Sequence, residues 1–181
     1  VVAVYTGMDL KDALATLPCV HSIENLEEPA HLAVALDIVR YAGDGVAVVV
    51  AETAAAAEDA ARHVHVEYEP LPVVVDVVEA TTANSDLVHE DIGTNIAFTS
   101  ITDVGNVDST FEDASVVIKQ RLVNQRQIPF AMEPRAVVAD YEAGYDKLTI
   151  WSSTQVPHFV RLLIAAICGH PENRVRVIAP E

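Results

Sequence analysis

The sequence predicts an α+β fold, and three patterns lead to that prediction. A strand, a helix and a second strand follow one another over residues 46–69, several β-rich runs joined by turns come after residue 96, and an amphipathic helix spans 157–168. Because 51% of the 181 residues are hydrophobic, the chain holds enough apolar surface for one good core or two small ones. This composition excludes an intrinsically disordered chain.

The N-terminal segment is predicted to begin with a strand and a short helix. Residues 1–5 form an apolar β run, and a Thr-Gly pair closes it. Asp9 is placed to cap a helix that continues to about Thr16, where a proline soon follows. A further short strand is expected at 38–40, before a glycine-rich turn.

A strand–helix–strand unit is predicted next. The near-continuous apolar run at 46–51 is typical of a strand that is covered on both faces. Thr53 is expected to cap the alanine-rich helix 54–63, and the alternating pattern at 65–69 indicates a half-buried strand. This spacing favours a β-α-β unit on a small sheet.

Residues 76–95 are polar and rich in turn-forming side chains, so they are the best candidate for a linker. The charge changes near the same place, because residues 1–90 carry 3 basic and 16 acidic side chains whereas residues 91–181 carry 8 and 11. Such an asymmetry indicates two units. We therefore expect a first domain at 1–75, the linker, and a second domain at 96–181.

The second domain is predicted to open with β structure and to end with a helix and a strand. Four strands are expected, at 96–101, 115–123, 136–141 and 147–152. A turn between the last two indicates a hairpin. The amphipathic helix comes next, with Gly169 at its C-terminal cap, and a final strand is expected at 175–178.

Composition excludes several classes of function. A formal charge of −16 argues against a binder of nucleic acid or of an anionic membrane, because phosphate contacts need clustered Lys and Arg. No apolar run reaches the ~18–20 residues of a membrane span, and the N-terminus lacks the basic region of a signal peptide. The two cysteines, Cys19 and Cys168, have no zinc-type spacing and indicate reduced, mostly buried thiols in a cytoplasmic protein.

Few residues point to chemistry by themselves. The sequence has no phosphate-binding glycine motif, no zinc-protease motif and no nucleophile elbow. His63 and His65 can share one face of a strand, but without a nearby carboxylate or thiolate they favour surface or packing roles over a metal. Glu133 and Arg135 flank a proline and suit an ion pair at a strand end or an edge that faces a partner.

The junction at 152–158 is chemically more suggestive, because a strand end there leads into a helix start. Ser153 or Thr154 is placed to cap that helix, and Pro157 fits its first turn. The N–H groups of a helix N-terminus suit an anion, and Gln155 would project from the junction with a donor and an acceptor. Plain helix capping explains the same residues.

Several segments, taken in order, resemble a known family. The segments 1–10, 39–44 with 46–53, and 66–72 are similar to the a/b hammerhead domain of molybdenum hydroxylase large subunits, which are the xanthine dehydrogenase, aldehyde oxidase and carbon monoxide dehydrogenase family. Matching segments in the second half are 88–91, 124–126, 132–135, 151–158 and 174–181. The last of these resembles the stretch that leads into the family's glycine-rich loop.

This resemblance implies a fold, an activity and partners. The fold would be an a/b hammerhead-like domain followed by the first part of a mixed α/β molybdopterin-binding domain. The family's large subunit binds a molybdenum–molybdopterin cofactor, usually the cytosine dinucleotide form in bacteria. It hydroxylates an aldehyde or a heterocycle, or oxidises carbon monoxide, with water as the oxygen source. An FAD-binding medium subunit and a 2Fe–2S iron–sulfur small subunit would take the electrons, in a dimer of heterotrimers.

Gln155 is the one site residue that the resemblance carries over. It matches the glutamine of the family's Ser-Thr-Gln segment, which approaches the oxo ligand of the metal and can donate a hydrogen bond to it. The resemblance thus implies a catalytic and cofactor-binding role for Gln155, and it gives no metal ligand in this chain. The carbon-monoxide-dehydrogenase-like branch is favoured, chiefly through 132–135 and 153–158, although Phe130-Ala131 stands where the family pattern has a proline.

The resemblance also implies that this sequence is an excerpt. The start of the hammerhead domain would precede Val1, and the glycine-rich loop and the catalytic glutamate would lie beyond Glu181. We therefore expect both domains to be incomplete and the chain to be inactive by itself. The alternative from another class is a free-standing, non-catalytic interaction module with the hammerhead fold.

Overall fold

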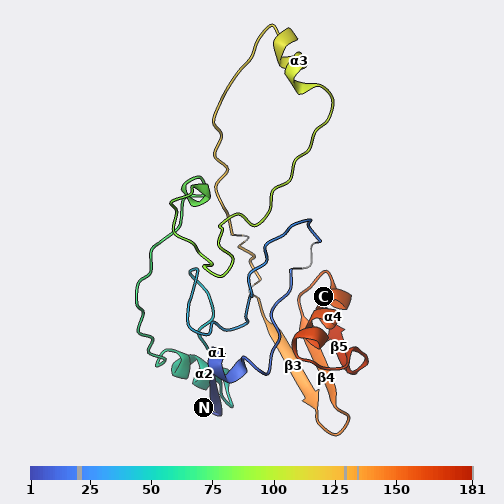
Figure 1. Cartoon of the computed structure of the whole chain (residues 1–181). Helices are drawn as coiled ribbons and strands as arrows, with labels where there is room; N and C mark the ends of the chain where they lie inside the picture. The colour runs from blue at the N-terminus through green and yellow to red at the C-terminus, as the bar shows by residue number, and fades with distance from the viewer. Residues whose placement is uncertain (20–21, 129, 134, 181) are drawn as a thin grey trace. The chain divides into compact units, whose positions relative to one another are not determined.

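The computed structural model describes residues 1–19, 22–128, 130–133 and 135–180. The chain divides into two units, of which the first combines Val1–Phe98 with Ala136–Glu181 and the second is Thr99–Arg135 (Figure 1). Helices and strands occur in both halves of the sequence, as the α+β prediction requires. No helix in the described part of the chain has the length and apolar character needed to cross a membrane.

The N-terminal strands form a small antiparallel sheet. β1 (Ala3–Thr6) pairs with β2 (Ala47–Val50) in a register that places Tyr5 opposite Val48. The strands predicted at 1–5 and 46–51 are thus confirmed. The expected cover on both faces of the second strand is wrong, because Val48 and Val50 are exposed.

The helix predicted from Asp9 to Thr16 is wrong. Helix α1 covers only Gly7–Leu10, and its N-cap is Thr6. The Asp9 carboxylate lies inside the first turn, where it accepts the backbone N–H of Thr6 at 2.8 Å and the Thr6 hydroxyl at 2.6 Å. The helix is therefore capped by Thr6, three positions before Asp9, which we expected as the cap.

Gly7 allows α1 to pack closely against the segment that follows it. A Cβ atom on this buried residue would lie 2.1 Å from the carbonyl oxygen of Ala35 and 2.7 Å from its carbonyl carbon. Both neighbours are backbone atoms, so a side chain at position 7 could be accommodated only by a shift of the main chain.

Helix α2 (Ala54–Ala61) confirms the predicted alanine-rich helix and its cap, because the Thr53 hydroxyl oxygen accepts the N–H of Ala56 at 3.2 Å. The β-α-β unit predicted around it is wrong. Neither 38–40 nor 65–69 is a strand, and β2 pairs with β1 in the antiparallel sense. Residues 65–69 are mostly exposed and lie along no other strand, so their alternating pattern has no sheet to join.

Side chains organise the polar segment at 76–95. The Asp76 carboxylate accepts the N–H groups of Val78 at 2.8 Å and Glu79 at 3.0 Å, where the 3₁₀-helix η1 (Glu79–Thr81) begins. The Asn95 amide donates to the carbonyls of Ala80 at 3.1 Å and Asp86 at 2.8 Å. Its oxygen accepts the N–H of Val88 at 2.9 Å, so one side chain ties three points of the segment together.

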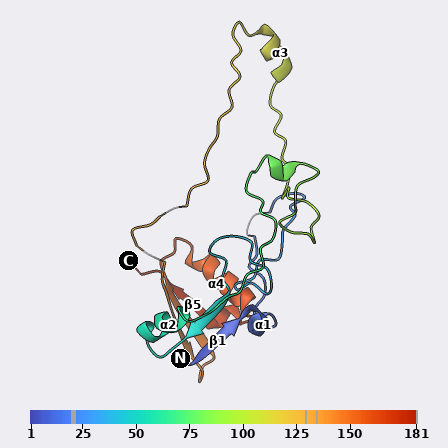
Figure 2. The same ribbon diagram turned by 90° about the vertical axis from the view of Figure 1, so that its left-hand side faces the viewer.

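The C-terminal elements form a mixed sheet with the strand order β3-β4-β5. β3 (Val137–Glu142) and β4 (Lys147–Ser152) form the predicted hairpin, and β5 (Val175–Ile178) runs parallel to β4. Helix α4 (Pro157–Ile167) is the crossover between the parallel strands and lies against the sheet (Figure 2). These four elements were predicted correctly.

The buried residues of the C-terminal elements are few. The buried residues are Thr149 and Ile150 of β4, Ala165 of α4 and Val175 of β5, whereas all six residues of the edge strand β3 are exposed. Both cysteines are exposed, and Cys168 is the C-cap residue of α4. The prediction of buried thiols is therefore wrong, because the described chain encloses so little interior.

The Thr99–Arg135 unit consists of two extended limbs joined by helix α3 (Val107–Asp113), which the sequence did not predict. The Asn106 side chain accepts the N–H of Ser109 at 3.3 Å and caps this helix. The strands predicted at 96–101 and 115–123 are wrong, because neither segment belongs to a sheet of the described residues. The Ala97 carbonyl accepts one backbone hydrogen bond, from the N–H of Glu27 at 2.8 Å, and 115–123 has none within the described part of the chain.

Candidate functional site at the end of strand β4

Gln155 lies in the four-residue connection between β4 and α4. Its side chain is exposed, and its amide forms no hydrogen bond within the described residues. The turn that presents it is held by Thr154, whose hydroxyl oxygen accepts the N–H of Val156 at 3.1 Å. Gln155 therefore offers one donor group and one acceptor group to a ligand.

The start of α4 lies directly after Gln155. The N-cap residue is Val156, and no side chain caps the helix, so the predicted cap by Ser153 or Thr154 is wrong. The Thr154 hydroxyl instead binds the N–H of Val156, which precedes the helix. Pro157 occupies the first turn as predicted, and the following N–H groups lack a side-chain acceptor.

The parallel pairing of β4 with β5 decides which other residues lie near this junction. Trp151 pairs with Ile178 near the end of both strands, so their carboxyl ends lie at the same edge of the sheet. Gln155 follows β4 at that edge, and Ala179 follows β5 there. Ligands of α/β proteins commonly bind outside the carboxyl ends of parallel strands.

A second polar cluster lies at the opposite end of β4. Asp146, in the hairpin turn with φ 52°, accepts the Tyr141 hydroxyl at 2.7 Å and the Arg174 guanidinium at 2.9 Å. The Tyr141 hydrogen bond, with help from His170 and Arg174, lowers the pKa of Asp146 from 3.8. The ring nitrogen Nε2 of His170 lies 3.2 Å from the Asp146 carbonyl oxygen. These contacts fasten the hairpin turn to the loop before β5.

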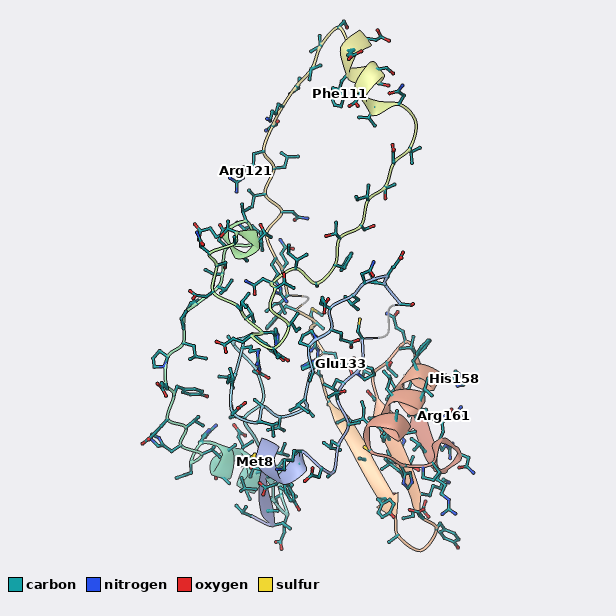
Figure 3. All side chains as sticks on the ribbon, in the orientation of Figure 1. Met8, Phe111, Arg121, Glu133, His158 and Arg161 are labelled. Atoms are coloured by element: carbon teal, nitrogen blue, oxygen red, sulfur yellow. The ribbon has the colours of Figure 1, made fainter. Side chains whose placement is uncertain are left out.

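Helix α4 is fastened to the same loop by an ion pair. Arg161 donates from Nε at 3.0 Å and from Nη2 at 2.6 Å to one carboxylate oxygen of Glu172, in the 3₁₀-helix η2 (Glu172–Arg174). Figure 3 shows Arg161 on α4 with His158 one turn nearer the N-terminus of the helix. The ion pair thus links the first half of α4 to the loop that precedes β5.

The other predicted side chains lie elsewhere. Glu133 and Arg135 are exposed residues of the Thr99–Arg135 unit, and the proline between them lies outside the described residues. His63 approaches the Asp59 carbonyl at 2.7 Å, and His65 lies 3.9 Å from Glu67, so both histidines have the surface role that we favoured. The described residues contain no group of three or more His, Cys, Asp or Glu side chains that could hold a metal ion.

A side-chain hydrogen bond that the sequence did not predict links two distant segments of the first unit. The Arg40 side chain donates to the Val88 carbonyl at 3.1 Å, and the Arg40 N–H donates to Asp44 at 3.1 Å. Burial, followed by the nearby Arg40 charge, lowers the pKa of His89 from 6.5. Both segments carry family resemblance, but the contact itself left no local signal because 48 positions separate Arg40 from Val88.

Comparison with protein-family models assigns both halves of the chain. Residues 1–72 match the aldehyde oxidase and xanthine dehydrogenase a/b hammerhead domain, and residues 88–181 match the molybdopterin cofactor-binding domain. The chain belongs to the molybdenum hydroxylase large-subunit family. The predicted succession of a hammerhead domain and the start of a molybdopterin-binding domain is confirmed.

Individual members of the family are similar over the whole chain. The nicotine 6-hydroxylase large subunit of Paenarthrobacter nicotinovorans is 34% identical over 98% of the chain, and the carbon monoxide dehydrogenase large chain of Afipia carboxidovorans is 33% identical over 100%. The crystal structure of quinoline 2-oxidoreductase from Pseudomonas putida 86 matches 99% of the chain at 30% identity, with a TM-score of 0.86.

The chain spans less than a quarter of the length of these relatives. It covers 22% of the nicotine 6-hydroxylase subunit, 23% of the carbon monoxide dehydrogenase chain and 23% of the quinoline 2-oxidoreductase chain. More than three quarters of each relative therefore has no counterpart in these 181 residues.

Proposed function

We propose that the chain is a part of the catalytic large subunit of a molybdenum-dependent oxidoreductase, and that it is inactive by itself. The complete subunit hydroxylates a carbon centre of a small molecule, or oxidises carbon monoxide, with oxygen from water. The observation that supports this best is the exposed Gln155 amide beside the uncapped start of α4, at the carboxyl edge of β4 and β5.

The donors at this junction fit the molybdopterin cofactor. A phosphate-bearing dinucleotide form of the cofactor is anionic and is suited to hydrogen-bond donors without nearby carboxylates. Gln155 supplies an amide N–H₂ group, and the first-turn N–H groups of His158 and Phe159 lack a side-chain acceptor. No acidic residue occupies the first turn of α4.

When bound, the molybdenum cofactor supplies the two-electron redox chemistry. The residues of this chain would bind and orient the cofactor. The Gln155 amide would donate a hydrogen bond to it, and the N-terminal dipole of α4 would stabilise negative charge nearby. Because Gln155 carries no proton that titrates near neutral pH, its role is positioning and hydrogen-bond donation, with no part in proton transfer. The general base lies in the remainder of the subunit.

The cofactor form and the assembly belong to the same proposal. We expect the cytosine dinucleotide form of molybdopterin, with an FAD-binding medium subunit and a 2Fe–2S small subunit as electron acceptors, in a cytoplasmic dimer of heterotrimers. Chromatography of the natural enzyme with flavin, iron and molybdenum analysis checks the partner subunits and the size of the assembly. A large subunit that purifies without flavin and iron partners contradicts them.

For the substrate, the segments 132–135 and 153–158 favour the carbon-monoxide-dehydrogenase-like branch. Relatives of similar identity are named for nicotine and for carbon monoxide, so a direct assay must decide. Carbon monoxide oxidation without hydroxylation of nicotine or quinoline supports the branch. Turnover of a heterocycle or an aldehyde in its place overturns it.

The role of Gln155 is tested with Gln155→Glu in the complete enzyme. The change removes the donated hydrogen bond and adds a negative charge, so kcat should fall by about 10²–10³-fold, the range measured when one preorganised donor is removed. Molybdenum content should stay within a factor of two or so of the unaltered enzyme, because one hydrogen bond is only part of the binding energy.

The matched control is Asn173→Asp, which makes the same amide-to-carboxylate change at an exposed residue of η2, beyond the other end of the sheet. It should leave kcat unchanged. Equal activities of Gln155→Glu and Asn173→Asp would exclude the proposed role for Gln155. A complete subunit that binds no molybdenum would exclude the proposed function as a whole.

A further inference from the structure

Residues 115–128, the return limb of the Thr99–Arg135 unit, form an extended segment without a partner in the described chain. No hydrogen bond of any kind involves these residues within the part that the structure describes. Val116 is 74% exposed, Ile118 83% and Leu122 83%. In Figure 3, Arg121 projects from this extended limb and Phe111 from the helix that precedes it. An ordered segment with so few contacts cannot offset its loss of conformational entropy.

The sequence of the limb is that of a strand that is covered on both faces. Successive side chains of an extended chain point to opposite sides, so Val116, Val117 and Ile118 place apolar groups on both. Leu122 and Val123 repeat the pattern after a polar triplet. A strand with one face in water shows apolar and polar residues in alternation, whereas a continuous apolar run is typical of a strand inside a domain.

We propose that residues 115–123 form an internal strand of the molybdopterin-binding domain, covered by the part of the same large subunit that lies outside these 181 residues. The inference rests on the proposed function, because it takes the chain to be part of such a subunit. The limb lies within the 88–181 match to the cofactor-binding domain, and more than three quarters of the relatives' length has no counterpart in this chain. Main-chain hydrogen bonds to neighbouring strands hold the strand in place, and the removal of both apolar faces from water stabilises it.

Other occupants fit the two-faced pattern less well. A partner subunit, or a second copy of this chain, would add to one edge or one face of the limb and leave apolar groups on the other side in water. The remainder of the large subunit can enclose both sides because it is part of the same domain. Each of these occupants gives a different result in the following experiment.

The test is hydrogen–deuterium exchange of amides 115–123 in three samples: the 181-residue chain, the complete large subunit alone, and the assembled enzyme. The proposal expects exchange in the complete subunit alone to be slower by about 100-fold or more than in the 181-residue chain, as for amides of a stable internal strand. Protection that first appears after the flavin and iron–sulfur subunits are added would assign the limb to a subunit interface. Protection that depends on protein concentration would assign the limb to an interface with a second copy. Absence of protection in all three samples would show that the limb is not a strand. Each of these results, like protection that needs the partner subunits, overturns the proposal.

Three substitutions in the complete subunit test the two faces. Val117→Lys and Ile118→Lys place a charge on opposite sides of the strand, and each should lower the midpoint of thermal unfolding or the yield of folded subunit. Asn84→Lys adds the same charge at an exposed asparagine outside this strand and should leave both unchanged. If only one of Val117→Lys and Ile118→Lys lowered the unfolding midpoint or the yield of folded subunit, one face of the strand would lie in water. That result would refute burial on both faces.

The outcome is separable from that of the proposed function. Exchange protection and unfolding midpoints do not require the cofactor, whereas molybdenum content and activity report only on the cofactor site. A protected limb in a subunit without molybdenum would keep this inference and reject the proposed function. An unprotected limb in an active, molybdenum-loaded subunit would do the reverse.

Discussion

The Tyr141 hydroxyl donates a hydrogen bond of 2.7 Å to the Asp146 carboxylate across the β3–β4 turn. Arg174, from the loop before β5, donates to the other oxygen of the same carboxylate at 2.9 Å. One acidic side chain thus joins the hairpin to the returning strand, at the end of the sheet opposite Gln155. Asp146 can adopt the left-handed conformation of this position because its short polar side chain tolerates it.

The Tyr141–Asp146 hydrogen bond makes the stability of the C-terminal elements dependent on pH at both extremes. The Tyr141 donor lowers the pKa of Asp146 below 3.8, so the contribution is present above that value and is lost as the pH falls through the folded pKa. The same bond raises the pKa of Tyr141 above 10.0, so its contribution is present below 10.0 and is lost as the pH rises through the folded pKa. Thermal unfolding measured across the pH range should show both losses.

Asp146→Asn should return the pKa of Tyr141 toward 10.0, because the charged acceptor is the main cause of the shift. The measurement is the carbon NMR signal of the tyrosine ring during a titration to alkaline pH. Tyr141→Phe should likewise reduce the acid-side loss that Asp146 causes, because it removes the largest of the interactions that lower the pKa of Asp146. An unchanged Tyr141 titration in Asp146→Asn would show that the hydrogen bond does not form in solution.

Gly7→Ala should destabilise the N-terminal sheet. The new Cβ would lie 2.1 Å from the Ala35 carbonyl oxygen, and overpacking of this kind typically costs about 1–3 kcal/mol. Gly144→Ala is the control, because nothing lies within 4 Å of a Cβ there and its φ is not positive. Chemical unfolding of both variants measures the difference, and equal stabilities would contradict the close approach of Gly7 to Ala35.

Asn95→Leu should loosen the segment at 76–95. The variant keeps a side chain of similar size but loses the bonds to Ala80, Asp86 and Val88, and a part-buried polar group left without its partner costs about 1–3 kcal/mol. Limited proteolysis should then cut within this segment at least several-fold faster than in the unaltered chain. Asn84→Leu, at an exposed asparagine of the same segment, should have no such effect.

Thr53→Ala should shorten or fray α2. The Thr53 hydroxyl accepts the N–H of Ala56, and loss of such a cap costs about 1 kcal/mol. Thr53→Ser keeps the hydroxyl and should restore most of the stability. Circular dichroism during thermal unfolding gives the comparison, and identical curves for the alanine and serine variants would show that the cap contributes nothing.

Local signals predicted the elements that are stabilised by neighbours in sequence. The hairpin, α4 and α2 were all predicted because a turn, a proline at a helix start and a threonine cap act over a few residues. The strands expected at 96–101 and 115–123 failed for the opposite reason. A strand needs a partner strand, and neither segment is paired in a sheet of the described residues.

The candidate site was predictable only in part. Position 155 was predicted because its segment resembles a family motif, and its role stays a prediction, whereas the absence of a side-chain cap on α4 could not be seen from Ser153 and Thr154. Two of the ties that hold the sheet, Arg161 to Glu172 and Asp146 to Arg174, join residues 11 and 28 positions apart. Contacts at such separations depend on the fold and leave no periodic trace in the sequence.

The parallel pairing of β4 and β5 also has a consequence for synthesis of the protein. The hairpin, α4 and β5 occupy one uninterrupted stretch, Val137–Ile178, and β4 finds both of its partner strands within it. Because all of these partners lie in one stretch, it can fold once β5 has left the ribosome, without any later part of the polypeptide. The Gln155 junction would then be in place while the rest of a longer polypeptide was still being translated.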